Sequence, residues 1–391
     1  MNKFFFFLWI FAGYALDVKI SAPSAILMNA ETGAVLYEKN AHTPMYPAST
    51  TKIATLLFIL DQKKPVFEAT VKVSAEALRL KPEKRTEQTP AYWGEIDGTK
   101  MGLMQGEVLP IDSLLHGLML VSGNDAANAL AETVSSSILE FLTELNSYMK
   151  SLGCIQTQFY NPHGLHDERH ITTAYEMGLM MKKALQIPKF REIISTRVYT
   201  RPKTNKQKAS EMVAINPMLK VGQKQHDARV IGGKTGFHSK AGYNLVVAAE
   251  QEGRTLIAVL FGGAKRKDRY EDAKRLFDAA FQETRMSETL FTPAHFFTYS
   301  LSDAKEPLQA VLKEDLSISY FPSERQICKA HVHWDPLELP IKQGQRVGEV
   351  RVSDLAGRVL QVGELVARED VLLTWTASMR RYWDGIKSFF F

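Results

Sequence analysis

The feature that most constrains the fold is a polar segment, Pro47–Lys52, followed at once by an apolar run, Ile53–Leu60. Proline, serine and threonine favour the cap and first turn of a helix, and a leucine-rich run behind them can be buried. If the helix begins near Ser49, then Ser49 and Lys52 lie one above the other on the same face. The segment therefore predicts a buried helix that begins with a hydroxyl beside an amine.

This pair of residue types indicates nucleophilic catalysis. A serine hydroxyl is a poor nucleophile at neutral pH and needs a base within hydrogen-bond reach. A lysine can be that base when burial or a second cation lowers the pKa of its ammonium group. We therefore predict that Ser49 and Lys52 form a nucleophile pair at the positively polarised end of the helix. The alternative is that Ser49 is only a cap and Lys52 is solvated, because this spacing occurs often by chance.

A second motif, Ser122–Asn124, separates two segments with helical periodicity, Leu114–Leu120 and Ala126–Val134. Serine, glycine and asparagine are also the ordinary residues of a helix connector. In the functional interpretation, Ser122 relays a proton to a leaving group. Asn124 then anchors both the substrate and the basic lysine through hydrogen bonds.

A third motif, Gly232–Gly236, precedes two runs that read as strands joined by a tight turn, Tyr243–Ala249 and Thr255–Phe261. A Lys-Thr-Gly sequence at the head of an edge strand lets a substrate peptide lie alongside that strand. Lys234 and Thr235 would then meet a substrate carboxylate. The flanking glycines permit close backbone approach, although they also mark ordinary bends.

The remaining sequence predicts a second domain. Residues 23–38 read as a hairpin and residues 81–100 as a polar surface excursion. From about Thr292 the texture changes to short alternating runs separated by turn residues, which predicts a small all-β domain. These runs are Leu308–Leu312, Ile318–Phe321, Lys329–Trp334 and Arg346–Val352.

Both ends of the chain suggest export and a membrane surface. Residues 1–15 combine an early lysine, the apolar run Phe4–Phe11 and small residues at a cleavage spacing, which predicts a signal peptide; the alternative is an uncleaved anchor. Residues 373–391 predict an amphipathic helix in a membrane interface, or one packed on its own domain. Its apolar residues are Trp375, Met379, Tyr382, Trp383, Ile386, Phe389 and Phe390.

Composition excludes some functions. The chain has 391 residues, enough for two domains, and its net charge of +5 comes without the basic and aromatic stripe that nucleic-acid binding requires.

Cys154 and Cys328 could form an inter-domain disulfide, but we expect two separately buried thiols. His163, His166 and His170 have a spacing that resembles a metal site. Because proline and glycine interrupt the segment, we predict no metal.

In their order and spacing, the three motifs resemble the active-site set of the low-molecular-mass penicillin-binding proteins, specifically the serine D-alanyl-D-alanine carboxypeptidases of peptidase family S11. The motifs are Ser49-Thr50-Thr51-Lys52, Ser122-Gly123-Asn124 and Lys234-Thr235-Gly236. Supporting stretches are Ser122–Ala127, Asn161–Leu165 and Lys234–Leu245. The resemblance covers roughly residues 20 to 285.

The resemblance implies an α/β (α+β) fold with three parts after the signal peptide. Residues 16–290 would form a β-lactamase/DD-peptidase-like catalytic domain with a central antiparallel sheet and a helical cluster. Residues 291–372 would form the small all-β domain, and residues 373–391 the membrane-anchor helix. The protein would be peripheral at the periplasmic face of the cytoplasmic membrane, with peptidoglycan stem peptides as substrates, β-lactams as covalent inhibitors and no cofactor.

The resemblance also implies roles for individual residues. Ser49 would attack the penultimate D-alanine and Lys52 would accept its proton, while a nearby Lys234 lowers the pKa of Lys52. The backbone N–H groups of Ser49 and Phe237 would bind the oxyanion. The remaining assignments place Ser122 as the proton relay and Asn124 as the anchor, with Lys234, Thr235, Gly236, Phe237 and Arg269 at the substrate. Phe237 departs from the histidine that often follows this motif in such enzymes.

Other functions fit less well. DD-endopeptidase activity on cross-links uses the same chemistry, and the sequence does not separate it from carboxypeptidase activity. A β-lactamase normally has Ser-Asp-Asn as its second motif and a glutamate before a Leu-Asn pair, whereas Leu142 occupies that position before Leu145-Asn146. A non-catalytic peptidoglycan-binding protein would not require the intact set of serines and lysines.

Overall fold

The computed structural model describes residues 6–9, 15–84, 86–325 and 327–390. Contacts between Cα atoms divide the chain into two compact units, one of residues 15–282 and one of residues 1–14 with 283–391. Each unit has its own cluster of buried apolar side chains. The division therefore falls slightly before the domain boundary expected near residue 290.

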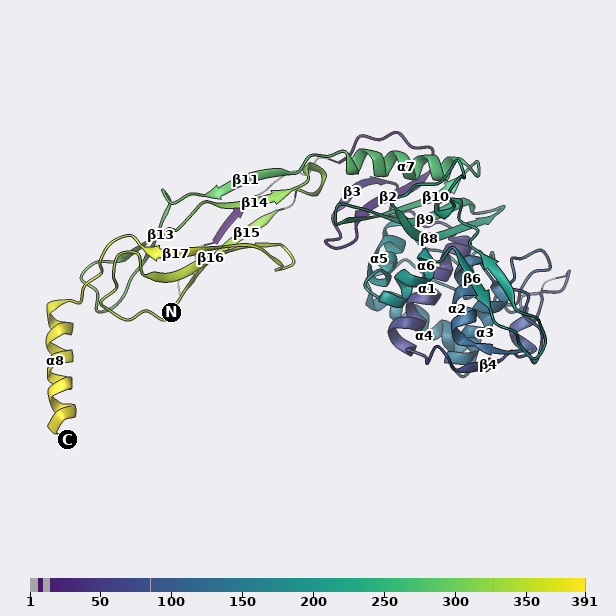
Figure 1. The fold of residues 1–391 in the computed structure, drawn as a ribbon, viewed down its shortest axis with the longest axis horizontal. Coiled ribbons are helices and arrows are strands. Elements are labelled where there is room, and N and C mark those ends of the chain that lie inside the picture. Colours follow the sequence, from purple (N-terminus) through teal and green to yellow (C-terminus); the bar gives the residue numbers. More distant parts are fainter. Residues whose placement is uncertain (1–5, 10–14, 85, 326, 391) are drawn as a thin grey trace. The chain divides into compact units, whose positions relative to one another are not determined.

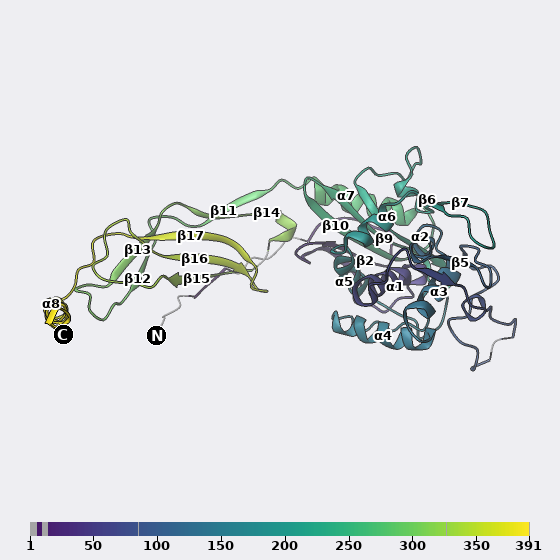
Figure 2. The same ribbon diagram turned by 60° about the horizontal axis from the view of Figure 1, so that its bottom comes forward.

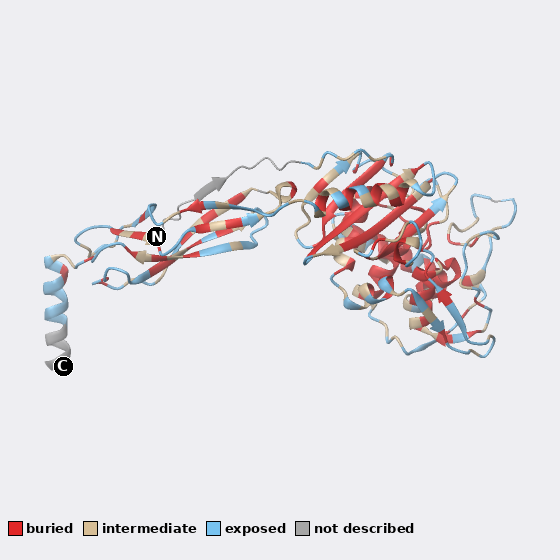
Figure 3. Cartoon of the chain, turned by 45° about the horizontal axis from the view of Figure 1, so that its top comes forward, coloured by how far each residue is buried: buried red, intermediate tan, exposed pale blue. Residues whose placement is uncertain are grey.

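The larger unit is built around a five-stranded antiparallel sheet with the strand order β3-β2-β10-β9-β8. Its strands are β2 (Ser24–Asn29), β3 (Val35–Lys39), β8 (Val230–His238), β9 (Gly242–Gln251) and β10 (Arg254–Gly263). Strands β9 and β10 are buried along most of their length (Figure 3). Such continuous apolar strands require cover on both faces of the sheet.

Helices provide this cover. The helix α7 (Asp268–Phe281) lies on one face of the sheet, while α5 (Ala174–Ala184) and α6 (Pro188–Ser195) lie on the other (Figure 1). The helical cluster below them contains α1 (Thr51–Phe58), α2 (Ile111–Leu120), α3 (Asn124–Val134) and α4 (Ile138–Ser151). This arrangement confirms the predicted central antiparallel sheet with a helical cluster.

The predicted local elements are present, with two adjustments. The run after Ser49 is helical, but its first turn is a 3₁₀ turn, Ala48–Thr50, and its end, Ile59–Lys63, is wound as a π-helix. The prediction that Lys-Thr-Gly heads an edge strand is wrong in one respect. β8 is an edge strand, but Lys234–Gly236 begins at its central residue, because the preceding Val230–Gly233 also pairs with β9.

Shorter elements complete this unit. Two small antiparallel pairs are β4 (Thr70–Lys72) with β5 (Val108–Pro110), and β6 (Val198–Arg201) with β7 (Ser210–Val213). Two 3₁₀ turns are Glu76–Leu78 and Pro217–Leu219. The described residues of the excursion, 81–84 and 86–100, form no helix, and most of their side chains are exposed or half-buried.

The smaller unit confirms the predicted all-β domain. Its six-stranded sheet has the order β1-β15-β16-β17-β13-β12, and a separate pair joins β11 to β14 (Figure 2). The strands are β1 (Phe6–Trp9), β11 (Met286–Phe291), β12 (Phe296–Tyr299), β13 (Leu308–Leu312), β14 (Leu316–Tyr320), β15 (Cys328–Trp334), β16 (Arg346–Asp354) and β17 (Val359–Ala367). A 3₁₀ turn, Pro322–Glu324, follows β14.

The two ends of the chain belong to this unit. Most of the predicted signal peptide, residues 1–5 and 10–14, lies outside the described residues, and the described part, β1, pairs with β15. The chain ends in helix α8 (Trp375–Phe390). None of the helices in the described part of the chain combines the length and apolarity needed to cross a bilayer.

Candidate active site

The predicted nucleophile pair, Ser49 and Lys52, lies where the first turn of the α1 region meets the edge of the sheet. Ser49 is half-buried in the 3₁₀ turn, and the Lys52 side chain is fully buried one turn later. Lys52 Nζ lies 3.2 Å from Ser49 Oγ. The predicted pair is therefore within hydrogen-bond reach, as a general base and its nucleophile must be.

The backbone around Ser49 is tightly fixed. Ala48 adopts a positive φ of 49°, a conformation that costs free energy in a residue with a Cβ and that persists only under strong constraint. Gly164, at φ +91°, supplies that constraint, because a Cβ on it would overlap the carbonyl of Ala48. On the other side, a Cβ on Gly236 would lie 3.1 Å from Ser49 N. The Lys-Thr-Gly strand thus lies directly against the turn that carries Ser49.

Three acceptors hold the Lys52 side chain. Its Nζ donates to Asn124 Oδ1 at 2.7 Å and to the carbonyl oxygen of His163 at 2.6 Å, in addition to its contact with Ser49. Burial lowers the pKa of Lys52 well below its usual range, the positive charge of Lys234 lowers it further, and the carboxylate of Asp125 opposes both. The lowered pKa of Lys52 and the contribution of the Lys234 charge to it are the effects predicted from the sequence. Burial and the Lys234 charge both favour a neutral amine that can accept a proton.

The second motif is a strained turn between α2 and α3. Ser122 is buried and has a positive φ of 61°, and Asn124 begins α3. Thr99 holds this turn through two hydrogen bonds. Its carbonyl oxygen accepts from the backbone N–H of Asn124 at 2.9 Å, and its hydroxyl donates to the carbonyl oxygen of Ser122 at 2.7 Å. The turn therefore depends on a segment that the sequence suggested only as a surface excursion.

We call this supporting segment, residues 98–103, the strap. Its second attachment is the Asp125 carboxylate, which accepts hydrogen bonds from the backbone N–H groups of Met101, Gly102 and Leu103 at 2.8 to 3.0 Å. Asp125 itself is buried. A carboxylate that accepts several backbone N–H groups fixes both partners strongly, so the strap positions Ser122 and Asn124.

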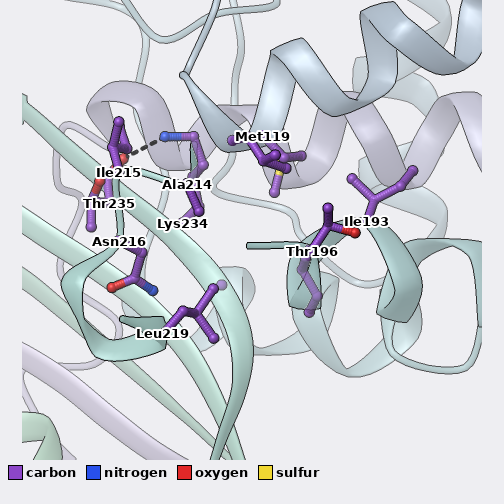
Figure 4. Close-up of a pocket in the computed structure, with 12 residues that line it drawn as sticks. Met119, Ile193, Thr196, Ala214, Ile215, Asn216, Leu219, Lys234 and Thr235 are labelled. Carbon is purple, nitrogen blue, oxygen red and sulfur yellow. Dashed lines mark hydrogen bonds between the residues drawn. The ribbon is translucent and has the colours of Figure 1, made fainter. Parts of the chain in front are cut away.

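Lys234 is the second buried amine of the site. Its Nζ donates to the Thr235 carbonyl at 2.9 Å (Figure 4). Around it lies a small pocket of about 10 Å³, with Met119, Ala214 and Leu219 among its apolar walls (Figure 4). Burial in these surroundings, followed by the nearby charge of Arg269, lowers the pKa of Lys234 to about 7. This is the ordinary effect of desolvation on an ammonium group.

Arg269, on α7, supports the motif strand from behind. Its guanidinium donates to the carbonyls of Gly236 at 2.9 Å and Asn244 at 2.8 Å, so its contacts are with the backbone of β8 and β9. On the same side, the exposed ring of Phe237 stacks on Tyr243 with the ring centroids 4.4 Å apart, and the Arg269 guanidinium lies 5.4 Å from the centroid of the Tyr243 ring. An aromatic platform thus borders the strand edge.

The structure brings most of the predicted site residues together. Ser49, Lys52 and Asn124 are in direct contact, Gly236 is against the backbone of Ser49, and Lys234 is close enough to perturb the pKa of Lys52. Thr235 is buried beside Lys234, and Phe237 follows them on β8. Ser122 is joined to this group through its turn.

Sequence reasoning missed two contributors. The carbonyl of His163 holds Lys52, and the strap holds the second motif. Backbone groups leave no residue-type signal, although the Asn161–Leu165 stretch did mark the right segment. His163 and His170 are buried in separate hydrogen bonds, to the Tyr92 carbonyl and to the Thr51 hydroxyl. Within the described residues, no three histidine, cysteine or acidic side chains are grouped to hold a metal ion.

Comparison with known proteins identifies relatives that share this architecture. Residues 13–265 match the family described as D-alanyl-D-alanine carboxypeptidase, peptidase family S11. The chain is 30% identical over 354 residues to the D-alanyl-D-alanine carboxypeptidase DacF of Bacillus subtilis, covering 90% of this chain and 86% of that protein.

Solved structures of two proteins with related names are similar to this chain. Penicillin-binding protein 5 of Haemophilus influenzae is similar with a TM-score of 0.62 and 26% identity, over 90% of this chain and 98% of that one. The Streptomyces K15 DD-transpeptidase, in a single-residue mutant form, matches with a TM-score of 0.59 and 27% identity, over 67% of this chain and 98% of its own. With the family match and these relatives, the chain belongs to the D-alanyl-D-alanine carboxypeptidases of peptidase family S11.

Proposed function

We propose that this protein removes the terminal D-alanine from peptidoglycan stem peptides through an acyl-enzyme on Ser49. The observation that carries the proposal is the contact between Lys52 Nζ and Ser49 Oγ at 3.2 Å, with the pKa of Lys52 lowered by burial and by Lys234. A neutral Lys52 accepts the hydroxyl proton as Oγ attacks the carbonyl carbon of the penultimate D-alanine. The bond to the terminal D-alanine then breaks.

The proposed reaction has two halves. In acylation, the oxyanion lies between the N–H groups of Ser49 and Phe237, and Ser122 passes a proton to the departing amine of D-alanine. In deacylation, Lys52 removes a proton from water, whose oxygen attacks the ester carbon and releases Ser49. The ester thus gives a shortened peptide with a new carboxylate and a regenerated hydroxyl.

Substrate binding follows from the strand edge. A peptide lying along β8 would place its terminal carboxylate at Lys234 and Thr235. Lys234 carries a substantial fraction of positive charge near neutral pH because its pKa is about 7. Arg269 contributes its charge from behind the strand and holds the carbonyl of Gly236. In this proposal, Asn124 serves both the substrate and Lys52.

Labelling with a fluorescent penicillin tests the nucleophile. The wild-type protein should form a stable covalent adduct, because a β-lactam acylates the same hydroxyl. Ser49→Ala should abolish labelling, whereas Ser287→Ala on β11 of the other unit should leave it unchanged. Labelling that persists in Ser49→Ala would place the nucleophile elsewhere.

A second candidate reaction is cleavage of cross-linked peptides. Cleavage of a cross-link would use the same nucleophile and base, with a larger amine as the leaving group in place of D-alanine. Release of D-alanine from a pentapeptide should exceed cleavage of a cross-linked dimer at equal concentration. Faster cleavage of the dimer would instead make the protein an endopeptidase.

We also propose that the protein acts at the periplasmic membrane surface, exported by the leader in residues 1–15 and held by helix α8. The described side chains Trp375, Met379, Tyr382 and Trp383 recur at steps of three and four and are exposed (Figure 3). An exposed aromatic face of this kind suits the interface of a bilayer. Full-length protein should co-sediment with anionic vesicles, and a chain ending at residue 372 should not.

A further inference from the structure

The loop that joins β6 to β7, residues 202–209, gives the strap a second attachment besides Asp125. The side chain of Gln207 in this loop donates from Nε2 to the carbonyl oxygen of Gly102 at 2.8 Å. The backbone N–H of the same glycine donates to the Asp125 carboxylate at 2.9 Å. Gly102 is therefore held through its N–H by one side chain and through its carbonyl by another.

Gln207 is itself fixed by a buried carboxylate. Its Nε2 donates a second hydrogen bond, to Glu107 Oε2 at 2.8 Å, and its Oε1 accepts from the Arg201 guanidinium at 3.0 Å. Glu107 is fully buried and also accepts from the Thr204 hydroxyl and the Met104 N–H, each at 2.9 Å. Both hydrogens of the Gln207 amide are thus used, which holds this side chain in one orientation.

The other end of the β6–β7 hairpin lies at two further parts of the site. After β7, the N–H of Ile215 donates to the carbonyl of Leu120, the last residue of α2, at 3.0 Å. Residues 214–216 also line the small pocket beside Lys234. The hairpin therefore contacts the strap at its tip and the segments next to the second and third motifs at its base.

Packing constrains the strap less than its hydrogen bonds do. A cavity of about 180 Å³ borders the strap, and Lys100, Gly102 and Leu103 form part of the cavity wall. Residues that line a cavity contact fewer protein atoms than residues in a close-packed core. The position of the strap therefore depends strongly on its hydrogen bonds, including the one from Gln207.

We propose that Gln207 is a positioning residue for the proposed reaction. By holding the Gly102 carbonyl it fixes the strap, and Thr99 of the strap fixes the Ser122–Asn124 turn through two hydrogen bonds. The inference rests on the proposed function, because it assigns a residue that orients the same site. Gln207 acts through the strap and not by contact with the substrate.

Gln207→Met tests the proposal, because it keeps the length of the side chain and removes the amide donors. The rate of acylation by fluorescent penicillin should fall roughly threefold to tenfold, the effect of one hydrogen bond. For D-alanine release, the loss should appear in kcat, with a smaller change in KM. The matched control is Gln223→Met, which makes the same change at an exposed glutamine and should keep the wild-type rate.

Two further variants separate positioning from a general effect on the fold. Gln207→Lys keeps a donor for both the Gly102 carbonyl and the Glu107 carboxylate, so it should retain most of the wild-type rate. Gln207→Asn keeps the amide but is one carbon shorter, so it should show the loss expected of Gln207→Met even if the methionine variant does not fold. Thermal unfolding shows whether each variant is folded.

A double-mutant cycle tests the path through the strap. If Gln207 acts through Thr99, then combining Gln207→Met with Thr99→Val should cost clearly less than the product of the two single losses in acylation rate. Losses that multiply in full would show that Gln207 does not act through Thr99, and would overturn the inference.

The outcomes also distinguish this inference from the function on which it depends. Equal acylation rates for folded Gln207→Met and Gln223→Met would overturn the role of Gln207 and leave the carboxypeptidase proposal intact. A wild-type protein that neither reacts with penicillin nor releases D-alanine would overturn the proposed function instead.

Discussion

At the scale of single residues, the site contains three buried cationic groups with few carboxylates to balance them. Lys52, Lys234 and Arg269 all have a lowered pKa, in each case chiefly because of burial. Arg269 also lowers the pKa of Lys234, and Lys234 that of Lys52. The charges form a chain in which each cation favours deprotonation of the next, and Lys52, the proposed base, lies at its end.

Removing Lys234 should therefore change the pH dependence of acylation. Lys52 must be neutral to accept a proton, so the acylation rate rises with pH through the pKa of Lys52. Lys234→Met keeps an apolar stem but removes the charge that lowers this pKa. The pKa should rise, and the acidic limb of the profile should move to higher pH. The rate of penicillin acylation against pH measures the shift.

The matched control is Lys313→Met, which removes an exposed lysine of the smaller unit. Its acidic limb should coincide with that of the wild-type protein. An unchanged limb in Lys234→Met would mean that the charge of Lys234 does not act on Lys52.

His170 should make the protein sensitive to acid. Burial lowers the pKa of His170 to about 3, against 6.5 for an unperturbed histidine. The unfolded state therefore binds a proton first, so the contribution to stability is complete above about pH 6.5 and is lost as the pH falls toward 3. In this window His170→Gln should reduce the slope of unfolding free energy against pH by up to about 1.4 kcal/mol per unit. Urea unfolding at several pH values measures it, and an unreduced slope would contradict the assignment.

At the scale of elements, two of the motifs proposed for catalysis are held by segments without regular structure. The strap at residues 98–103 holds the Ser122–Asn124 turn, and the loop at Gly164 holds the turn that carries Ser49. The positive φ of both Ala48 and Ser122 shows that these turns are constrained by their surroundings. The helices and the sheet provide the frame, while irregular segments set the final geometry of the reactive groups.

Thr99→Val should slow acylation because it removes the hydrogen bond to the Ser122 carbonyl while preserving the shape of the side chain. We expect a loss of roughly tenfold in kcat with a smaller change in KM, equivalent to about 1.4 kcal/mol. Thr99→Ser retains the hydroxyl and should restore most of the rate. If valine and serine give equal rates, the hydroxyl does not position the turn.

At the scale of the whole molecule, each unit contains its own core. The larger unit buries its apolar side chains between the sheet and the helical cluster, and the smaller unit buries a separate set within its strands.

Residues 15–282 should accordingly fold and react alone. A chain ending at Gln282 keeps the complete antiparallel sheet and every residue proposed for catalysis. It should show a single cooperative unfolding transition and a penicillin acylation rate within about twofold of the full chain, the scatter expected when no site contact is removed. An aggregated or unlabelled product would show that the second unit is needed for the catalytic one.

Much of this arrangement could be predicted from the sequence because its signals are local. The apolar run behind Ser49, the helices around Ser122–Asn124 and the strands after Lys234 all carry their own periodicity. The strap could not be predicted, because residues 98–103 make their contacts through backbone groups and one hydroxyl. The position of Lys234–Gly236 within β8 could not be predicted from the sequence either, because the glycines before it resemble a bend but continue the strand.

The two cysteines of the chain are both buried and poorly reactive. Cys154 is buried in the larger unit and Cys328 in the smaller, in line with the two separately buried thiols expected from the sequence. Burial raises the pKa of the Cys154 thiol to about 12 and also raises that of Cys328, so both resist conversion to the reactive thiolate. One cysteine introduced on the surface would therefore be the more reactive thiol and would provide a selective attachment point for a spectroscopic probe.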